Sequence, residues 1–203
     1  MTDHVAIDAG VFRGVAVCVS SEGTRYYLRG VALQVSEGQG RIVATDGHRM
    51  MIHCFETHYS GQVDIIIPIE AIKRAFTGWK KAWERILIEG RDRDWKIGDV
   101  AFQPIDGTFP DWTRVFPKMD DGSAGQLAHF NHSYIGDLAK IGKLVGIQPT
   151  INHFGNNPAV ITFGERDDVF GILMPRREEA RSTADLRIML EQAPLPAPRD
   201  NAA

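Results

Sequence analysis

One feature constrains the fold more than any other: the order strand, helix, strands recurs three times along 203 residues. The segments HVAID (4–8), VDIIIP (63–68) and QLAHFN (126–131) are short and apolar, and each runs directly into a segment with helical periodicity. The junctions fall near Asp8, Pro68 and Asn131, about sixty residues apart. This spacing predicts three copies of one structural unit.

The three predicted helices have different support. Pro68 suits the first turn of the second helix, where its missing N–H leaves no bond unmade, and Gly78 is the predicted end of that helix. Asn131 or Ser133 is able to cap the third helix, which has a regular apolar stripe. The first helix, over about 8–19, has the weakest pattern because it is rich in valine and contains two glycines.

Strand-like sequence follows each helix. Segments such as RYYLRGVALQVSE (25–37), ERILIEG (84–90) and AVITFGE (159–165) alternate apolar and polar residues and are rich in β-branched types. Gly, Asp and Asn turns separate such segments, which is typical of antiparallel strands. With helices on one face of antiparallel sheets, the sequence predicts an α+β protein.

Composition also marks the domain boundaries. The clearest linker is PKMDDGSAG, so we expect a first domain over 1–117, a linker over 118–125 and a half domain over 126–177. Residues 178–203 form a C-terminal tail. Residues 182–192 of this tail have the pattern of a short amphipathic helix, and its Pro/Ala-rich end is expected to be disordered.

Charge, cysteines and hydropathy exclude several classes of protein. A formal net charge of −3 does not suit a protein that coats nucleic acid with its whole surface, although it permits a local basic face. Cys18 and Cys54 have no CxxC spacing and no histidine cluster, which favours a reduced chain without structural zinc. The sequence shows no signal-peptide pattern, and none of its apolar runs approaches the length of roughly 20 residues that a membrane helix requires. We therefore expect a cytoplasmic protein with no membrane partner.

The turn Asp46-Gly47-His48-Arg49 stands between two apolar runs and invites a catalytic interpretation. His48 lacks a second histidine at ligand spacing, and no Ser or Cys nucleophile motif accompanies it. We therefore expect neither catalysis, nor a metal site, nor a cofactor here. The local prediction is a tight turn in which Asp46 bonds the backbone and Gly47 takes a positive φ.

Five motifs, in this order, resemble a known family: RYYLRGVAL (25–33), RIVATDGHRM (41–50), GTFPDWTRVFP (107–117), FNHSYIGDL (130–138) and GILMPRR (171–177). Together they resemble the bacterial sliding clamp, the beta subunit of DNA polymerase III. The first two copies are similar to the family's middle domain, and the third is similar to the second half of its last domain. Counterparts of the family's first domain, and of the first half of its last domain, are absent from this chain.

The resemblance implies the DNA clamp fold, in which half-domain repeats form a ring with sheets outside and helices lining the hole. A clamp ring contains twelve such units and this chain supplies three, so four chains would complete a ring. The third unit would expose a sheet edge and an apolar helix face that a neighbouring chain must cover. We therefore expect head-to-tail assembly, with a homotetramer favoured over a trimer.

The distribution of charge agrees with DNA inside such a ring. Residues 68–85 carry a net charge of +3 and residues 133–144 a net charge of +1, which leaves −7 for the remainder of the chain. Basic side chains attract phosphates without reading bases, and tyrosine stacks on an exposed base or bonds a phosphate. The alternative is that these are solvated helix faces. With the resemblance, the predicted DNA-binding residues are Tyr26, Tyr27, Lys73, Arg74, Lys80, Lys81, Lys140 and Lys143.

The resemblance also gives the charged turn a role. In sliding clamps the matching residues edge a hydrophobic cleft that receives short linear motifs from polymerases, clamp loaders and repair enzymes. Without the resemblance, Leu28 and residues 172–174 would be interpreted as strand core. Position by position, the predicted peptide-binding cleft comprises Leu28, Thr45, Gly47, His48, Arg49, Met50, Pro110, Arg114, Val115, Asn131, Tyr134, Ile172, Leu173, Met174, Pro175 and Arg176.

The function implied by the resemblance is that of a processivity factor, a ring on duplex DNA that tethers a DNA polymerase or other replication proteins. The short chain suggests a phage or mobile-element form. One alternative is a non-ring, clamp-like interaction protein that acts as a decoy or inhibitor of a host replication clamp. Another is an enzyme that uses Asp46 and His48. The apolar side chains at 186–190 could also occupy the chain's own cleft.

Overall fold

The computed structural model describes residues 4–59, 61–79, 84–116, 128–153, 155 and 157–176. The predicted linker, the predicted tail, Lys80 and Lys81 lie outside these residues.

The first unit comprises β1 (His4–Asp8), α1 (Ala9–Ala16), β2 (Gly30–Ser36), β3 (Gln39–Thr45) and β4 (Arg49–Glu56). The second comprises β5 (Val63–Pro68), α2 (Ile69–Ala75), β6 (Arg85–Arg91), β7 (Asp94–Ile97) and β8 (Val100–Phe102). The third comprises α3 (His132–Val145), β9 (Thr150–Asn152), β10 (Ala159–Phe163) and β11 (Arg166–Leu173).

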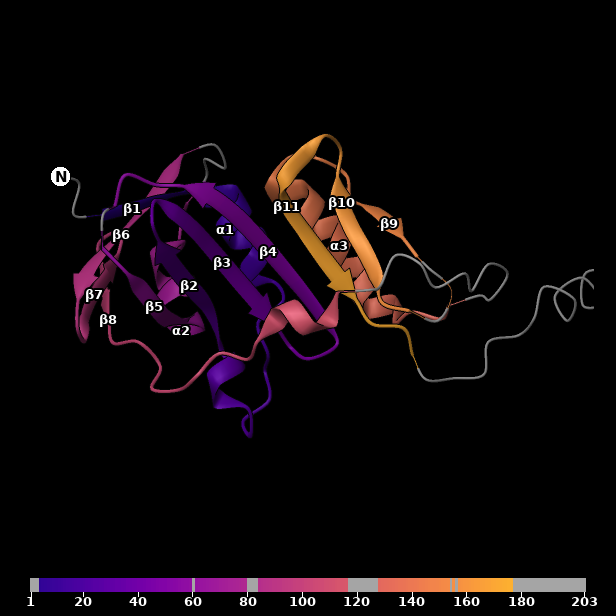
Figure 1. The fold of residues 1–203 in the computed structure, drawn as a ribbon, viewed down its shortest axis with the longest axis horizontal. Helices are drawn as coiled ribbons and strands as arrows, with labels where there is room; N and C mark the ends of the chain where they lie inside the picture. Colours follow the sequence, from indigo (N-terminus) through magenta and orange to yellow (C-terminus); the bar gives the residue numbers. More distant parts are fainter. Residues whose placement is uncertain are drawn as a thin grey trace, which may run out of the picture.

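The units join in two different ways, which we call the exchange joint and the last-strand joint. In the exchange joint, the first and second units swap their opening strands, because β1 pairs with β6 and β5 pairs with β2. In the last-strand joint, the final strands of the first and third units, β4 and β11, pair antiparallel. The resulting sheets have the orders β1-β6-β7-β8 and β5-β2-β3-β4-β11-β10-β9. This antiparallel architecture, with three α-helices among the described residues, confirms the predicted α+β class (Figure 1).

The third unit differs from the prediction at its start. Residues 128–131, the described part of the expected strand at 126–131, form no strand, and the Arg176 N–H donates to the His129 carbonyl oxygen at 2.6 Å. The physical reason lies in the exchange joint, where each opening strand pairs with the other half of the domain. Within the described part of the chain, the third unit has no such half to pair with. Accordingly, β9 stands at the end of the larger sheet, with no further strand beside it among the described residues.

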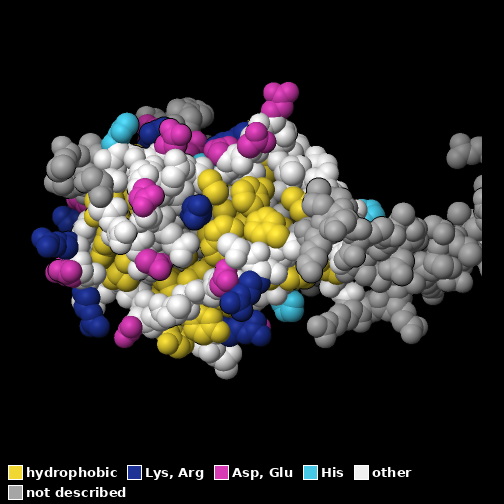
Figure 2. Space-filling model, in the orientation of Figure 1, with side chains coloured by type: hydrophobic (Ala, Val, Ile, Leu, Met, Phe, Trp, Pro, Cys, Tyr) yellow, Lys and Arg dark blue, Asp and Glu magenta, His cyan; other side chains and the backbone are white. Residues whose placement is uncertain are grey.

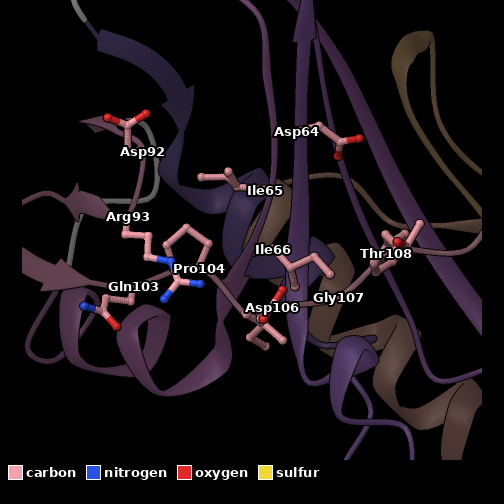
Figure 3. Close-up of a pocket in the computed structure, with 12 residues that line it drawn as sticks. Asp64, Ile65, Ile66, Asp92, Arg93, Gln103, Pro104, Asp106, Gly107 and Thr108 are labelled. Atoms are coloured by element: carbon pink, nitrogen blue, oxygen red, sulfur yellow. The ribbon is translucent and has the colours of Figure 1, made fainter.

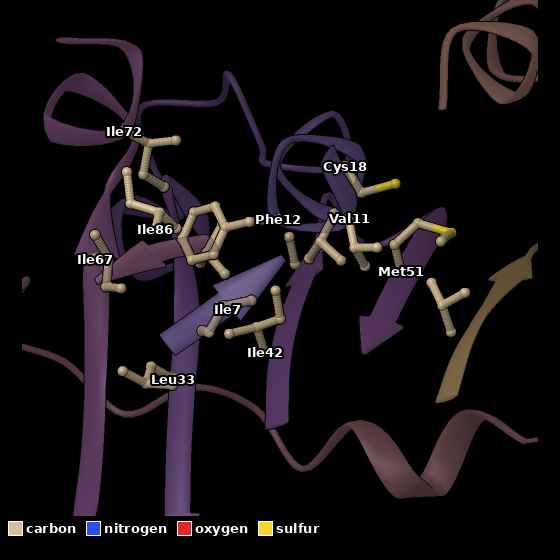
Figure 4. Close-up of a cluster of buried hydrophobic side chains, with 14 of the residues drawn as sticks. Ile7, Val11, Phe12, Cys18, Leu33, Ile42, Met51, Ile67, Ile72 and Ile86 are labelled. Carbon is tan, nitrogen blue, oxygen red and sulfur yellow. The ribbon is translucent and has the colours of Figure 1, made fainter. Parts of the chain in front are cut away.

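The helices lie on one face of the sheets and share one core with them (Figures 1 and 4). Alternation along the strands sends Leu33 and Ile42 to the helix face, where Phe12 of α1 also lies. The intervening residues, such as Val43, face the opposite side and form a second apolar cluster. The segment 103–116 packs on that side, and the Ile105 N–H donates to the Ile66 carbonyl oxygen of the edge strand β5 at 2.9 Å. Both faces of the larger sheet are therefore apolar.

The helix termini follow the predicted chemistry. The Asp8 carboxylate accepts a hydrogen bond from the Val11 N–H at 2.9 Å, and the Asn131 side chain accepts one from the Ser133 N–H at 3.0 Å. Two helices end earlier than expected: α1 ends at Ala16, and α2 ends at Ala75, where a turn that includes Gly78 at φ 74° follows. The cause in α2 is the early turn, since the Thr77 N–H donates to the Arg74 carbonyl oxygen.

The expected strand over 25–37 is also shorter than predicted. Tyr26 and Tyr27 lie in the 3-10 helix η1 (Tyr26–Leu28), closed by a bond from the Arg29 N–H to the Tyr26 carbonyl oxygen at 3.0 Å. The strand begins only at Gly30, where a Cβ would lie 2.4 Å from the Ile67 carbonyl oxygen of β5. Tyr26 and Tyr27 therefore lie outside the strand that their sequence pattern predicted.

Candidate functional site

The charged turn has the predicted local structure. One carboxylate oxygen of Asp46 accepts from the backbone N–H groups of His48 and Arg49, at 2.9 and 3.0 Å. The Thr45 hydroxyl donates to the Arg49 carbonyl oxygen at 2.7 Å and accepts from the Gly47 N–H at 3.0 Å. Gly47 has a φ of 91°, which favours glycine. The turn between β3 and β4 is thus fixed by its own side chains.

The Arg49 side chain extends from this turn to the last-strand joint. Its guanidinium donates to the Asp46 carboxylate at 3.0 Å, to the Asp137 carboxylate of α3 at 2.6 Å and to the Val17 carbonyl oxygen after α1 at 3.3 Å. It also lies 4.5 Å from the centre of the Tyr134 ring. Burial acts to lower the pKa of Arg49, but the Asp137 hydrogen bond and nearby acidic groups raise it above its ordinary value. A permanent charge therefore joins the first unit to α3.

An apolar pocket of about 220 Å³ opens beside the turn, on the side of the sheet away from the helices. Met50 of β4 and Ile172 of β11 are almost fully buried at its floor, and Leu28 of η1 adds a third apolar side chain. The short 3-10 helix η2 (Trp112–Val115) forms one wall. The complete lining is Arg25, Tyr27, Leu28, Thr45, Gly47, Arg49, Met50, Pro110, Asp111, Trp112, Val115, Ile172 and Met174.

Nine predicted cleft residues line this pocket: Leu28, Thr45, Gly47, Arg49, Met50, Pro110, Val115, Ile172 and Met174. The four lining residues that sequence reasoning missed are Arg25, Tyr27, Asp111 and Trp112. All four belong to the motifs RYYL and FPDWTRV, so their positions beside predicted cleft residues were a usable signal. The Trp112 indole N–H also donates to the Gln34 side-chain oxygen at 3.5 Å, which links η2 to β2.

Other predicted cleft residues lie beside the pocket or behind it. His48 stacks on Tyr134 at 6.3 Å between ring centres, and its carbonyl oxygen accepts from the Met174 N–H at 2.8 Å. Leu173 is 1% exposed and belongs to the core on the helix face, since it alternates with Ile172 along β11. Four predicted cleft residues remain. Asn131 caps α3, and Arg114 pairs with Asp111 at 2.9 Å. Pro175 and Arg176 follow Met174 along the chain.

The face away from the helices carries a broad apolar surface that adjoins this pocket. Hydrophobic side chains gather at its centre, over β4 and β11 (Figure 2). Phe116, which is 37% exposed, packs on Phe170 of β11 at 5.8 Å and on Trp112 at 6.1 Å between ring centres. A different pocket near β5 is larger, about 440 Å³, but is edged by the side chains of Asp64, Asp92 and Asp106 (Figure 3). Its charged rim does not suit an apolar peptide.

The helices carry a modest excess of positive charge. Arg13 gives α1 a net charge of +1, and the charged side chains of α2 and of α3 also sum to +1 each. Lys140 and Lys143 of α3 are exposed and have no ion pair among the described residues. Lys73 pairs with Glu70 at 3.4 Å, and Arg74 donates to the Ala101 carbonyl oxygen at 3.2 Å.

Tyr26 and Tyr27 lie in η1 and not on these helices. Tyr26 is 53% exposed, whereas Tyr27 is half-buried beside the apolar pocket. Their rings make an edge-to-face contact with 5.7 Å between centres. Tyr26 is therefore the accessible member of the pair.

Residues 9–111 match the family model of the DNA polymerase III beta subunit, central domain. This chain belongs to that family. It is 30% identical to the beta sliding clamp of Proteus mirabilis over 107 residues, which cover 49% of this chain and 29% of that protein. The chain thus spans about three tenths of the curated relatives that it matches.

Solved beta subunits share the fold over a longer stretch. The DNA polymerase III beta subunit of Pseudomonas aeruginosa is 18% identical with a TM-score of 0.68, over 87% of this chain and 67% of that one. The beta subunit of Borrelia burgdorferi, in complex with a natural product, is 16% identical with a TM-score of 0.71, over 87% of this chain and 63% of that one. The family model ends near η2, so the third unit is related through its fold.

Three further observations bear on the sites of this beta-subunit family member. Within the described ranges, no helix is long and apolar enough to cross a membrane. The same residues contain no group of three or more His, Cys, Asp and Glu side chains that could hold a metal ion. Burial raises the pKa of the Cys18 thiol to about 12, which keeps it protonated at neutral pH.

Proposed function

We propose that this chain is a sliding clamp that assembles into a closed ring around duplex DNA and tethers a polymerase or another replication protein. One observation carries the proposal: three clamp units follow one another with their helices on one face, and the edge strands β8 and β9 lie at opposite ends of the described part of the chain (Figure 1). Four copies would supply twelve units. The function requires no chemical step, because a closed ring holds its cargo at a high effective concentration by topology alone.

DNA would lie against the helix face. Lys140 and Lys143 are the best-supported contacts, since both are exposed and neither has an ion pair within the part of the chain that the structure describes. Lys73, Arg74, Lys80 and Lys81 are proposed to extend this basic surface along the second unit. Tyr26 is proposed to touch the DNA backbone at one rim of the ring, while Tyr27 belongs to the pocket.

The ring itself is tested by its dependence on DNA topology. The full chain is incubated with nicked circular plasmid and passed through a gel-filtration column at moderate salt. We expect it to elute with the plasmid and to be lost when a restriction enzyme linearises the plasmid first. Equal retention on both forms would indicate ordinary surface binding and contradict the ring. Failure to bind either form, with capture of clamp-binding proteins, would support the decoy alternative.

The apolar pocket is proposed to receive the peptide motif of the tethered protein. Met174 lines this pocket and follows directly after β11, so Met174→Glu places a carboxylate in an apolar site without altering a strand. We expect at least about a tenfold loss of affinity for a labelled peptide that carries the apolar clamp-binding motif of a DNA polymerase. Fluorescence anisotropy measures it. The exposed Leu87→Glu on β6 is the matched control, and equal losses in the two variants would remove the pocket from the proposal.

A further inference from the structure

One position in the helices has a different environment in the third unit. The fourth residue after the N-cap is Phe12 in α1, Ile72 in α2 and Ile135 in α3. Phe12 is 0% exposed and Ile72 is 3% exposed, whereas Ile135 is 42% exposed. The same apolar position is therefore buried in two units and open to solvent in the third. A large aliphatic side chain at such a position gains stability from a covering partner.

The cover of this position in the complete domain comes from the other half. Phe12 of α1 lies 5.8 Å from Phe76, the eighth residue after the second N-cap, between ring centres. The equivalent eighth residue after the third N-cap is Ala139, which is also exposed. Ile135 and Ala139 thus occupy, on α3, the positions that correspond to Phe12 and Phe76, which contact each other in the complete domain.

The sheet edge above this helix face is open as well. In the complete domain the first strand after each helix pairs with an opening strand from the other half: β2 with β5, and β6 with β1. Its counterpart in the third unit, β9, pairs with β10 on one side, and no described strand lies on its other side. The segment from Ala128 to Asn131, which would be the opening strand, also has no strand partner among the described residues. Helix face and sheet edge are incomplete on the same side.

The kind of partner follows from the two kinds of joint. Each unit has one exchange side and one last-strand side. Within the chain, an exchange side pairs only with another exchange side, and a last-strand side pairs only with another last-strand side. The third unit has already used its last-strand side, where β11 pairs with β4, so its open side is an exchange side. The second unit has used its exchange side, so β8 offers a last-strand side. Head-to-tail assembly would set unlike sides against each other, a contact with no counterpart in this fold.

We propose that the third unit binds the third unit of a second copy about a twofold axis and so completes a clamp domain from two chains. Ile135 would pack on Ala139 of the partner subunit, and the residues from Ala128 that lead into α3 would lie along the partner's β9 edge. The contact is isologous, because both copies contribute the same surface. It deepens the proposed function, and in the ring the open β8 side would then meet the β8 side of another copy. In a ring of four chains assembled in this way, exchange joints and last-strand joints would alternate all the way round.

The helix contact is tested by Ile135→Glu. We expect the wild-type tetramer to fall to half its mass in native mass spectrometry at micromolar concentration, because two buried carboxylates would face each other's apolar surface. Leu87→Glu is the control, since the Leu87 side chain is 44% exposed on β6, in the sheet that contains neither β9 nor β11. Unchanged mass for Ile135→Glu, with an unaltered circular dichroism spectrum in both variants, would overturn the proposal.

The symmetry of the contact is tested by crosslinking. The double variant Ile135→Cys, Ala139→Cys, in a Cys54→Ser background, is oxidised in the absence of DNA. A twofold contact predicts covalent dimers and nothing larger, because the two bonds close on each other. A ladder of higher covalent species, or no product, would contradict it. If covalent dimers form but the protein is retained equally on circular and linear DNA, the proposed interface is supported and the proposed clamp function is contradicted.

Discussion

Replacing Gly171 with valine is expected to lower the free energy of unfolding by about 3 kcal/mol, at the upper end of what overpacking costs, and to loosen the third unit from the first. Gly171 of β11 stands opposite Met51 of β4 in the last-strand joint. A Cβ at this position would lie 2.6 Å from the Met51 sulfur and 2.7 Å from the Met50 carbonyl oxygen. The carbonyl oxygen belongs to the paired backbone, so the strands must move apart. Urea denaturation measures the loss, and limited proteolysis detects the loosened unit.

A second glycine in the same unit provides the control for Gly171. Gly136 lies in α3, and a Cβ there would meet nothing within 4 Å. Gly136→Ala is therefore expected to raise the free energy of unfolding by about 0.5–1 kcal/mol through helix propensity. If Gly171→Val unfolds at the same urea concentration as wild type, the close approach of β4 and β11 is not as described.

Replacing Arg49 with alanine is expected to cost about 2–3 kcal/mol of stability. The change leaves the Asp46 and Asp137 carboxylates and the Val17 carbonyl oxygen without their shared donor. The cost lies below that of breaking a fully buried ion pair, because the Asp137 side chain is 36% exposed. Thermal or urea unfolding gives the value. The loss should be accompanied by weaker peptide binding, since Arg49 also lines the pocket.

An exposed arginine in the same region separates this effect from the general loss of a charge. Arg114 pairs with Asp111 at 2.9 Å, but its side chain is 82% exposed. Arg114→Ala should not change stability measurably, because water and salt screen such pairs. A double-mutant cycle of Arg49→Ala with Asp137→Asn should show non-additive losses. Strict additivity would mean that Arg49 does not couple the turn to α3.

The regular elements were the most predictable part of the fold. The opening strands at 4–8 and 63–68 formed over the residues given by their apolar pattern, and Asp8 and Asn131 cap their helices as their chemistry indicates. The failed strand prediction at 126–131 has its cause in tertiary context. The segment at 126–131 has strand-like residues, but a strand needs a partner and this chain offers none in its described part. Local propensity does not contain that information.

The candidate pocket was predictable from motif positions, but only in outline. The RYYL and FPDWTRV motifs lie more than seventy residues apart, and their meeting depends on how the segment 103–116 crosses the sheet. Trp112 was missed because it lines the pocket only through the orientation of η2 toward that pocket, which the sequence does not show. Leu173 was included because sequence alone did not fix which of two neighbouring strand residues faces the pocket.

Electron microscopy of the unliganded full chain tests the central claim most directly. Two-dimensional class averages should show closed rings of twelve similar units, three per chain, with a central hole wide enough for duplex DNA. Arcs with free ends, or a compact particle without a hole, would contradict the account.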